Sequence, residues 1–242
     1  MQSKTKQDNS STLNKIRQGR ERTNILRKYE QASIAFLVER MPAWVTSDML
    51  TAFGLFGSVI TFLGFILARF CDRCLLLISI IGFIINWFGD SLDGRLAYYR
   101  NKPRKWYGFS LDFCTDWITA ILIGLGYLLY DNSNWELFGF IFAVLYGLEM
   151  MIALLRYKII NAYSIDSGIL GPTEVRIILA LILILEVVVP GSIVFSVIGG
   201  SLLLVVTCAS DFMKLLKMAD ARDKEERKAK SQANITTADS SI

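Results

Sequence analysis

The chain has 242 residues, 53% of them hydrophobic, and its 26 Lys and Arg residues exceed its 22 Asp and Glu residues by four. The basic residues lie beside apolar segments and are mixed with acidic ones, so we expect them to meet anionic lipid headgroups and not nucleic acid. Histidine is absent, which excludes the commonest general base and the commonest metal ligand of proteins.

The apolar residues come in blocks that divide the chain into three parts. Residues 1–30 are polar, residues 31–218 form a membrane domain, and residues 219–242 form a charged tail that we expect to be disordered. At the start of the membrane domain, residues 31–45 mix apolar and charged side chains, which predicts an amphipathic helix on the membrane surface. An ordinary lead-in to the first span is the alternative.

Six apolar runs have about the length that a helix needs to cross a hydrocarbon core. We therefore predict an all-α, polytopic integral membrane protein with six transmembrane helices after the interfacial helix. The fifth run is the shortest, and Pro190 and Gly191 after it predict a tight turn. The predicted spans are 48–70, 75–99, 108–130, 136–157, 173–189 and 191–213.

The first connection, between the first two of these spans, carries Cys71 and Cys74, which are separated by two residues. A structural zinc site needs four ligands, and the neighbouring sequence supplies no others. We interpret the pair as incidental, with a disulfide or a redox role as the alternative.

The positions of Lys and Arg in the short connections predict the orientation of the chain. Five basic residues lie from Arg95 to Lys105, around the second connection, and Arg156 and Lys158 mark the fourth, whereas residues 131–136 in the third contain none. Because basic residues concentrate on the cytoplasmic side, we expect the second and fourth connections to face the cytoplasm. An even number of spans then places both termini there as well.

Four aspartates lie inside two consecutive predicted spans, Asp90 and Asp93 in the second and Asp112 and Asp116 in the third. A charged residue within the membrane costs about 2.5–3.5 kcal/mol on insertion scales, so four of them indicate a function. Spacings of three and four residues place the members of each pair on one helix face. The two faces can close on each other near the cytoplasmic surface, which a water-soluble nucleotide can reach.

Four carboxylates in one low-dielectric site repel one another unless a hard cation lies between them. We therefore predict one or two Mg²⁺ or Mn²⁺ ions bound by these aspartates, an arrangement that suits phosphoryl transfer. Small residues share the two aspartate faces, namely Gly94, Ala97 and Gly108. They either leave room for a ligand beside the helix backbone or allow tight packing of the helices.

The spacing of these residues resembles the signature of the CDP-alcohol phosphotransferase (CDP-alcohol phosphatidyltransferase) family, written DxxDGxxAR and then GxxxDxxxD. Every fixed position except one is matched in register. The exception is Tyr98, which stands where the signature has Arg. The matching residues are Asp90, Asp93, Gly94, Ala97, Gly108, Asp112 and Asp116.

The resemblance implies a phospholipid-synthesis enzyme that moves a substituted phosphate group from a CDP-linked donor to a hydroxyl acceptor and releases CMP. It implies that the four aspartates bind the metal and that Asp116 is also the catalytic base. The residues that it places against the CDP are Asp93, Gly94, Ala97 and Gly108.

Two points about the substrates stay open at this stage. The donor is either CDP-diacylglycerol, which we favour, or a small CDP-alcohol used with a lipid hydroxyl; membrane lipid is a partner in both cases, and the sequence also allows a homodimer. Four basic residues are candidates for binding the acceptor or a phosphate, with anchoring of helix ends as the alternative. They are Arg100, Lys105, Arg156 and Arg176.

A cation- or proton-coupled transporter is the alternative from another class, because intramembrane aspartates also bind such ions. It predicts internal repeats and carboxylates at the middle of the membrane. The sequence shows no repeat, and the aspartates lie near one surface. A noncatalytic membrane scaffold would leave four costly aspartates unexplained.

Overall fold

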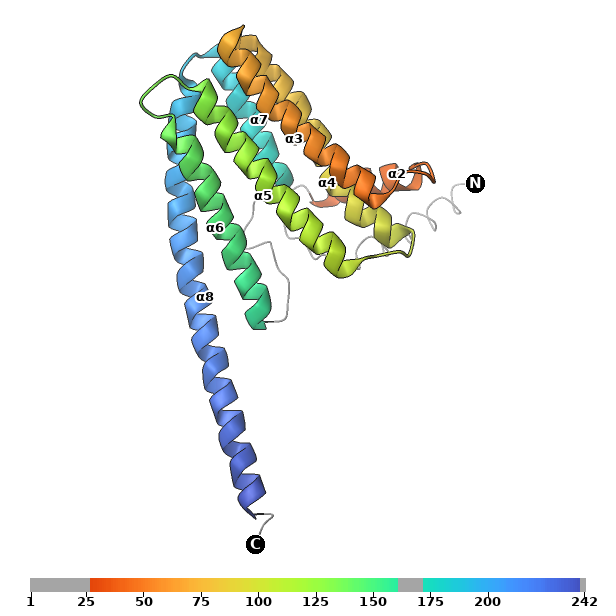
Figure 1. The fold of residues 1–242 in the computed structure, drawn as a ribbon, viewed down its shortest axis with the longest axis vertical. Coiled ribbons are helices and arrows are strands. Elements are labelled where there is room, and N and C mark those ends of the chain that lie inside the picture. The colour runs from red at the N-terminus through yellow and green to blue at the C-terminus, as the bar shows by residue number, and fades with distance from the viewer. Residues whose placement is uncertain (1–26, 161–171, 240–242) are drawn as a thin grey trace.

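The computed structural model describes residues 27–160 and 172–239, and every regular element within these ranges is helical (Figure 1). This confirms the predicted all-α fold. Most of the predicted N-terminal polar segment lies outside the described residues. The elements are α2 (Arg27–Glu39), α3 (Ser47–Phe70), η1 (Arg73–Leu75), α4 (Leu76–Tyr99), α5 (Lys105–Tyr130), α6 (Leu137–Ile160), α7 (Pro172–Val188) and α8 (Ser192–Asp239).

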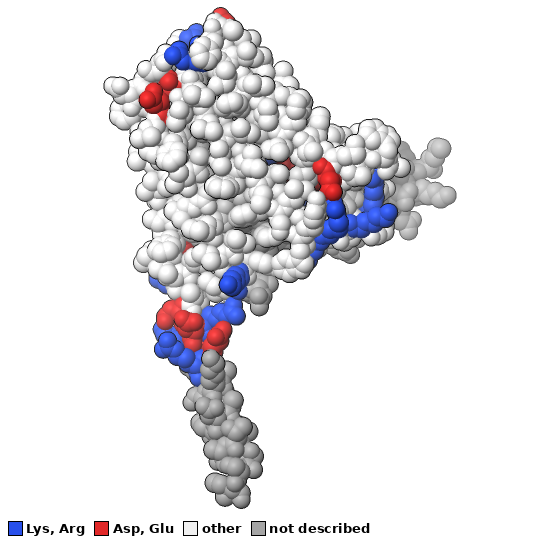
Figure 2. All heavy atoms as spheres, in the orientation of Figure 1, with Lys and Arg blue, Asp and Glu red and all other residues white. Residues whose placement is uncertain are grey.

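Five helical segments are long and apolar enough to cross a membrane, as expected for a polytopic membrane protein. The fifth predicted span, 173–189, corresponds to α7, whose 17 residues make it shorter than the five segments of membrane-spanning length. Figure 2 shows charged atoms near the α4–α5 connection and where α8 leaves the other helices, and a smaller group at the opposite end, with a broad uncharged surface between them. The five segments are Ser47–Phe70, Arg73–Tyr99, Lys105–Tyr130, Leu137–Ile159 and Ser192–Arg227.

Helices α3 and α4 pack in direct backbone contact, and this contact requires glycine at several positions. A Cβ atom added at Gly57 would lie 2.4 Å from the backbone nitrogen of Asn86, and one added at Gly89 would lie 2.4 Å from that of Gly54. Close approach of this kind lets transmembrane helices associate by van der Waals packing. The hairpin therefore holds the carboxylate-bearing end of α4 in a fixed position beside α3.

The first connection, between α3 and α4, carries two of the three exposed cysteines. Cys71 and Cys74 are free thiols, so the structure contains no disulfide between them. The carboxylate of Asp72 accepts a hydrogen bond from the backbone nitrogen of Cys74 at 2.7 Å. The interpretation of the pair as incidental stays a prediction.

Helix α2 corresponds to the predicted interfacial helix, but it occupies Arg27–Glu39 and not 31–45. Pro42 follows shortly after its end, and a proline disfavours helical geometry in the residue before it. Its apolar face is buried against α4, with Ile34 and Val38 in one cluster with Leu92. The helix therefore covers α4 as well as exposing apolar side chains such as Phe36 to the surroundings.

The C-terminal segment differs from the prediction of a disordered tail that begins at residue 219. Helix α8 continues as one helix from Ser192 to Asp239 and projects beyond the other helices (Figure 1). The segment is rich in Ala, Lys, Glu and Arg, which favour helix, and Lys224 pairs with Asp220 at 2.6 Å one turn away. Helix propensity and spacing of charges explain the difference, because charge alone does not prevent a helix from forming.

Candidate active site

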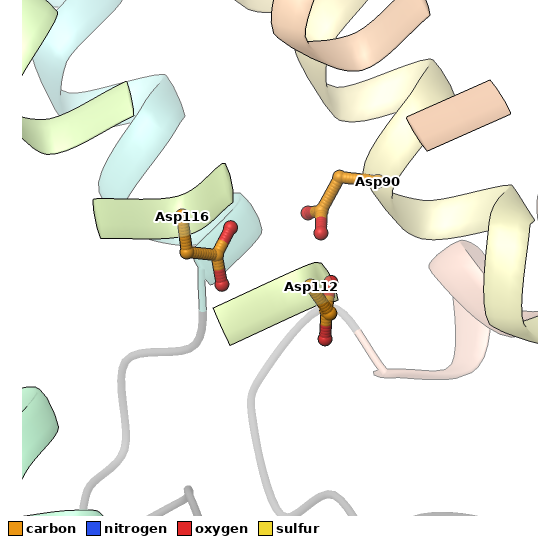
Figure 3. Close-up of side chains that lie close together, drawn as sticks. All are labelled: Asp90, Asp112 and Asp116. Carbon is orange, nitrogen blue, oxygen red and sulfur yellow. The ribbon is translucent and has the colours of Figure 1, made fainter. Parts of the chain in front are cut away.

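Three aspartate carboxylates converge between α4 and α5 (Figure 3). Asp90 comes from α4, and Asp112 and Asp116 come from successive turns of α5. One oxygen of each carboxylate lies within 4.8 Å of the others, and all three residues are partly buried. Three oxygens from acidic side chains are the ligand type that a hard divalent cation prefers, so this group fits Mg²⁺ or Mn²⁺.

Asp93, the fourth predicted ligand, is not one of these three. Its side chain is buried, and one carboxylate oxygen accepts a hydrogen bond from the hydroxyl of Thr51 at 2.6 Å. The other oxygen accepts from the backbone nitrogen of Gly94. All four aspartates nevertheless line one small inner cavity, so Asp93 lies next to the group of three.

An open cleft lies beside this inner cavity and is formed by the ends of α3, α4 and α5. All four residues that the signature places against CDP line the cleft, together with Asp90 and Asp112. Asp116 lines the inner cavity and is not part of the cleft lining. The residues predicted to contact the donor therefore line the cleft, and the predicted base lies in the adjoining inner cavity, which shares Asp90, Asp93 and Asp112 with the cleft.

The structure distinguishes the two interpretations of the small residues on the aspartate faces. A Cβ atom added at Gly94 or Gly108 would meet no described atom within 4 Å, whereas glycines in the α3–α4 contact would clash with backbone. Helix packing among the described residues therefore does not require glycine at these two positions. Open space beside the helix backbone is what a bound ligand requires.

Two of the predicted basic residues form ion pairs with aspartates. Arg176 donates to Asp90 at 2.7 Å, so it touches the carboxylate group from α7. Arg156 donates to Asp211 at 3.1 Å and joins α6 to α8. Arg156 does not line the cleft.

The other two predicted basic residues lie on either side of the α4–α5 connection. Lys105 lines the cleft. Arg100 donates instead to backbone carbonyls of the α2–α3 connection, among them Pro42 at 2.7 Å and Val45. It therefore fixes that connection and does not line the cleft.

Three polar residues that line the cleft were not identified as site residues from the sequence, namely Asp48, Thr51 and Arg104. Thr51 lines both the cleft and the inner cavity, and Asp48 pairs with Arg104 across the cleft. No local spacing marks these residues, because each partner is more than forty positions away along the chain. The one available signal is the three-residue spacing of Asp48 and Thr51, which places both residues on one face of α3.

Comparison with known protein families gives a match to the family described as CDP-alcohol phosphatidyltransferase. The match covers residues 44–213, which include all four aspartates and all six predicted spans. A search of curated proteins finds no significant match.

Proposed function

Because this chain belongs to the CDP-alcohol phosphatidyltransferase family, we propose that it transfers a phosphatidyl group from CDP-diacylglycerol to an alcohol in phospholipid synthesis. The observation that carries this proposal is the open cleft at Gly94 and Gly108, whose lining includes two of the three converging carboxylates, Asp90 and Asp112. A nucleotide diphosphate needs space beside a helix and a site that compensates its negative charge. Residues 31–218 would form the catalytic domain.

The proposed metal ligands are Asp90, Asp112 and Asp116, with Asp93 completing the set from the side of the cleft. Bound Mg²⁺ or Mn²⁺ would hold phosphate oxygens and offset the negative charge that develops during transfer. Arg176 supports this set, because its ion pair holds the carboxylate of Asp90 in place. Thr51 does the same for Asp93 through its hydroxyl.

We propose direct displacement, with Asp116 as the base. The acceptor oxygen forms a bond to the phosphorus that carries the diacylglycerol, the bond from that phosphorus to the bridging oxygen breaks, and CMP leaves. Asp116 takes the proton of the acceptor hydroxyl, a role that requires a place next to the donor, and its inner cavity shares Asp90, Asp93 and Asp112 with the cleft lining. A carboxylate is a weak base, so positioning and charge compensation must supply much of the rate enhancement.

We propose further that the site and both termini face the cytoplasm. The cleft lies beside the α4–α5 connection, where basic residues are concentrated. A nucleotide can reach the cleft from water at that surface, and a lipid can enter from the adjacent leaflet.

Purified protein given each radiolabelled CDP donor with a panel of acceptors tests the proposal. We expect CMP release with CDP-diacylglycerol and a polar alcohol. Release only from a small CDP-alcohol in the presence of a lipid hydroxyl would reverse the donor assignment. No release with any pair would refute the transfer reaction itself.

A further inference from the structure

An ion pair crosses the exposed edge of the cleft between two residues that lie 56 positions apart. Arg104 precedes the first residue of α5, Asp48 lies in the first turn of α3, and the guanidinium of Arg104 donates to the carboxylate of Asp48. Both residues line the cleft. We propose that Arg104 binds the diphosphate of the CDP donor and that Asp48 holds Arg104 over the cleft until the donor arrives. This inference rests on the proposed function.

The cleft needs a cation from outside the signature. Tyr98, which lines the cleft, stands where the signature has Arg. Arg100, the nearest substitute along the sequence, is occupied by the carbonyls of the α2–α3 connection. Arg95 also lines the cleft but is buried, at 7% exposure, within α4. Among the residues that the structure describes, Arg104 and Lys105 are the exposed cations of the cleft lining.

Arginine suits this role better than lysine because of its shape. Its planar guanidinium can donate two parallel hydrogen bonds to phosphate oxygens, whereas an ammonium acts as a point charge. The centroid of the Tyr107 ring lies 4.2 Å from the guanidinium carbon of Arg104, so the side chain keeps a second contact at the start of α5 when it leaves Asp48.

The ion pair with Asp48 is weak enough to be exchanged. The side chains of Arg104 and Asp48 are 52% and 44% exposed, and exposed ion pairs contribute little to stability. A diphosphate carries more negative charge than one carboxylate and accepts bidentate hydrogen bonds. Asp48 also repels an approaching diphosphate, so it competes with the donor for Arg104. Arg104 therefore contacts the donor only after its ion pair with Asp48 has broken.

Two substitutions of the same ion pair separate donor binding from a structural role, because donor binding predicts opposite effects. Arg104→Gln removes the phosphate ligand, so we expect the Kd for CDP in the presence of Mg²⁺ to rise roughly tenfold to a hundredfold. Asp48→Asn removes the competitor, so we expect the Kd to stay unchanged or to fall. Titration calorimetry of the full chain in detergent measures both. Adding Tyr98→Arg to Arg104→Gln should restore part of the affinity, since both positions line the cleft.

Lys224→Gln is the matched control, because it removes another exposed ion-paired cation outside the cleft. Equal losses of CDP affinity in Arg104→Gln and Asp48→Asn would overturn the proposal and make the pair a structural latch. Unchanged affinity in Arg104→Gln, or a rise confined to the KM of the acceptor, would overturn it as well. Absence of CMP release in the wild type would refute the transfer reaction but not the role of Arg104, because CDP binding is measured without turnover.

Discussion

Arg176, in the first turns of α7, donates a hydrogen bond at 2.7 Å to Asp90 of α4, which is 86 positions away in the chain. Both side chains are largely buried, with 14% and 19% of their surfaces exposed. A buried guanidinium beside a carboxylate fixes the orientation of that carboxylate, because leaving either charge unpaired is costly. Arg176 therefore positions one member of the carboxylate group, in addition to any contact that its remaining donors make with an acceptor.

Removal of divalent metal should abolish catalysis. The carboxylates of Asp90, Asp112 and Asp116 lie within 4.8 Å of one another and repel in the absence of a cation. We expect excess EDTA to stop CMP release and Mg²⁺ or Mn²⁺ to restore it. Mg²⁺ should also raise the thermal midpoint of the wild type, because a ligand that binds only the folded state stabilises it. Full activity in excess EDTA would disprove the metal assignment.

Alanine at the two cleft glycines should weaken donor binding without lowering stability. Gly94→Ala and Gly108→Ala place a methyl group in open space and favour helix, so we expect an unchanged or higher thermal midpoint. We expect the KM for the donor to rise about tenfold, since the methyl group occupies the space proposed for the ligand.

Two other glycines serve as controls for this experiment. Gly89→Ala should lower the thermal midpoint by several degrees, because its Cβ would lie 2.4 Å from backbone atoms of α3. Gly199→Ala, which also meets open space but lies in α8, should change neither stability nor KM. A normal donor KM in both cleft variants would show that no ligand lies against these glycines.

Substitution of two aspartates should separate catalysis from donor binding. Asp116→Asn keeps the shape of the side chain but removes the proposed base, so we expect kcat to fall by a factor on the order of 100 or more with a smaller change in CDP affinity. Asp93→Asn alters a residue of the cleft that accepts from Thr51, so it should weaken CDP and metal binding together. Near wild-type turnover in Asp116→Asn together with an inactive Asp93→Asn would require another base.

Cysteine labelling should determine which side of the membrane each connection faces. After replacement of the four natural cysteines, we expect Asn134→Cys to react with an impermeant reagent added outside intact cells and Lys102→Cys to remain unlabelled. Lys102 is preferred over its neighbour Asn101, which has a φ of 54° that most other residues adopt with strain. The reverse labelling pattern would place the cleft on the outside and contradict the cytoplasmic assignment.

The sequence predicted the parts of the structure that depend on local periodicity. The apolar runs located the starts of the membrane helices within a few residues, and the three- and four-residue spacings predicted that Asp90 would lie close to Asp112 and Asp116. The sequence could not predict which polar residue forms a hydrogen bond with each charged residue. Asp93 pairs with Thr51 across the α3–α4 contact, a partner set by the rotation of one helix against the other and not by spacing within either.

Arg156 has two possible roles: it forms an ion pair with Asp211, and it is a candidate for binding an anionic acceptor. The two side chains are 14% and 8% exposed and lie 3.1 Å apart between α6 and α8. Asp211 also accepts a hydrogen bond from Lys214 at 2.8 Å, so Arg156→Met removes one of its two cationic partners, and we expect the free energy of unfolding to fall by about 2 kcal/mol. Replacing both, as in Arg156→Met with Asp211→Leu, substitutes apolar contact for the pair and should restore most of the thermal midpoint.

The acceptor kinetics of the double variant decide between the two roles. If the pair only joins α6 to α8, the double variant regains stability and releases CMP with the wild-type KM for the acceptor. If Arg156 binds the acceptor, stability returns but the KM stays raised about tenfold, since the lost charge-assisted hydrogen bond is not replaced. Because Arg156 does not line the cleft and already donates to Asp211, we expect the first result. A raised KM for the acceptor in a stable double variant would show instead that Arg156 binds the acceptor.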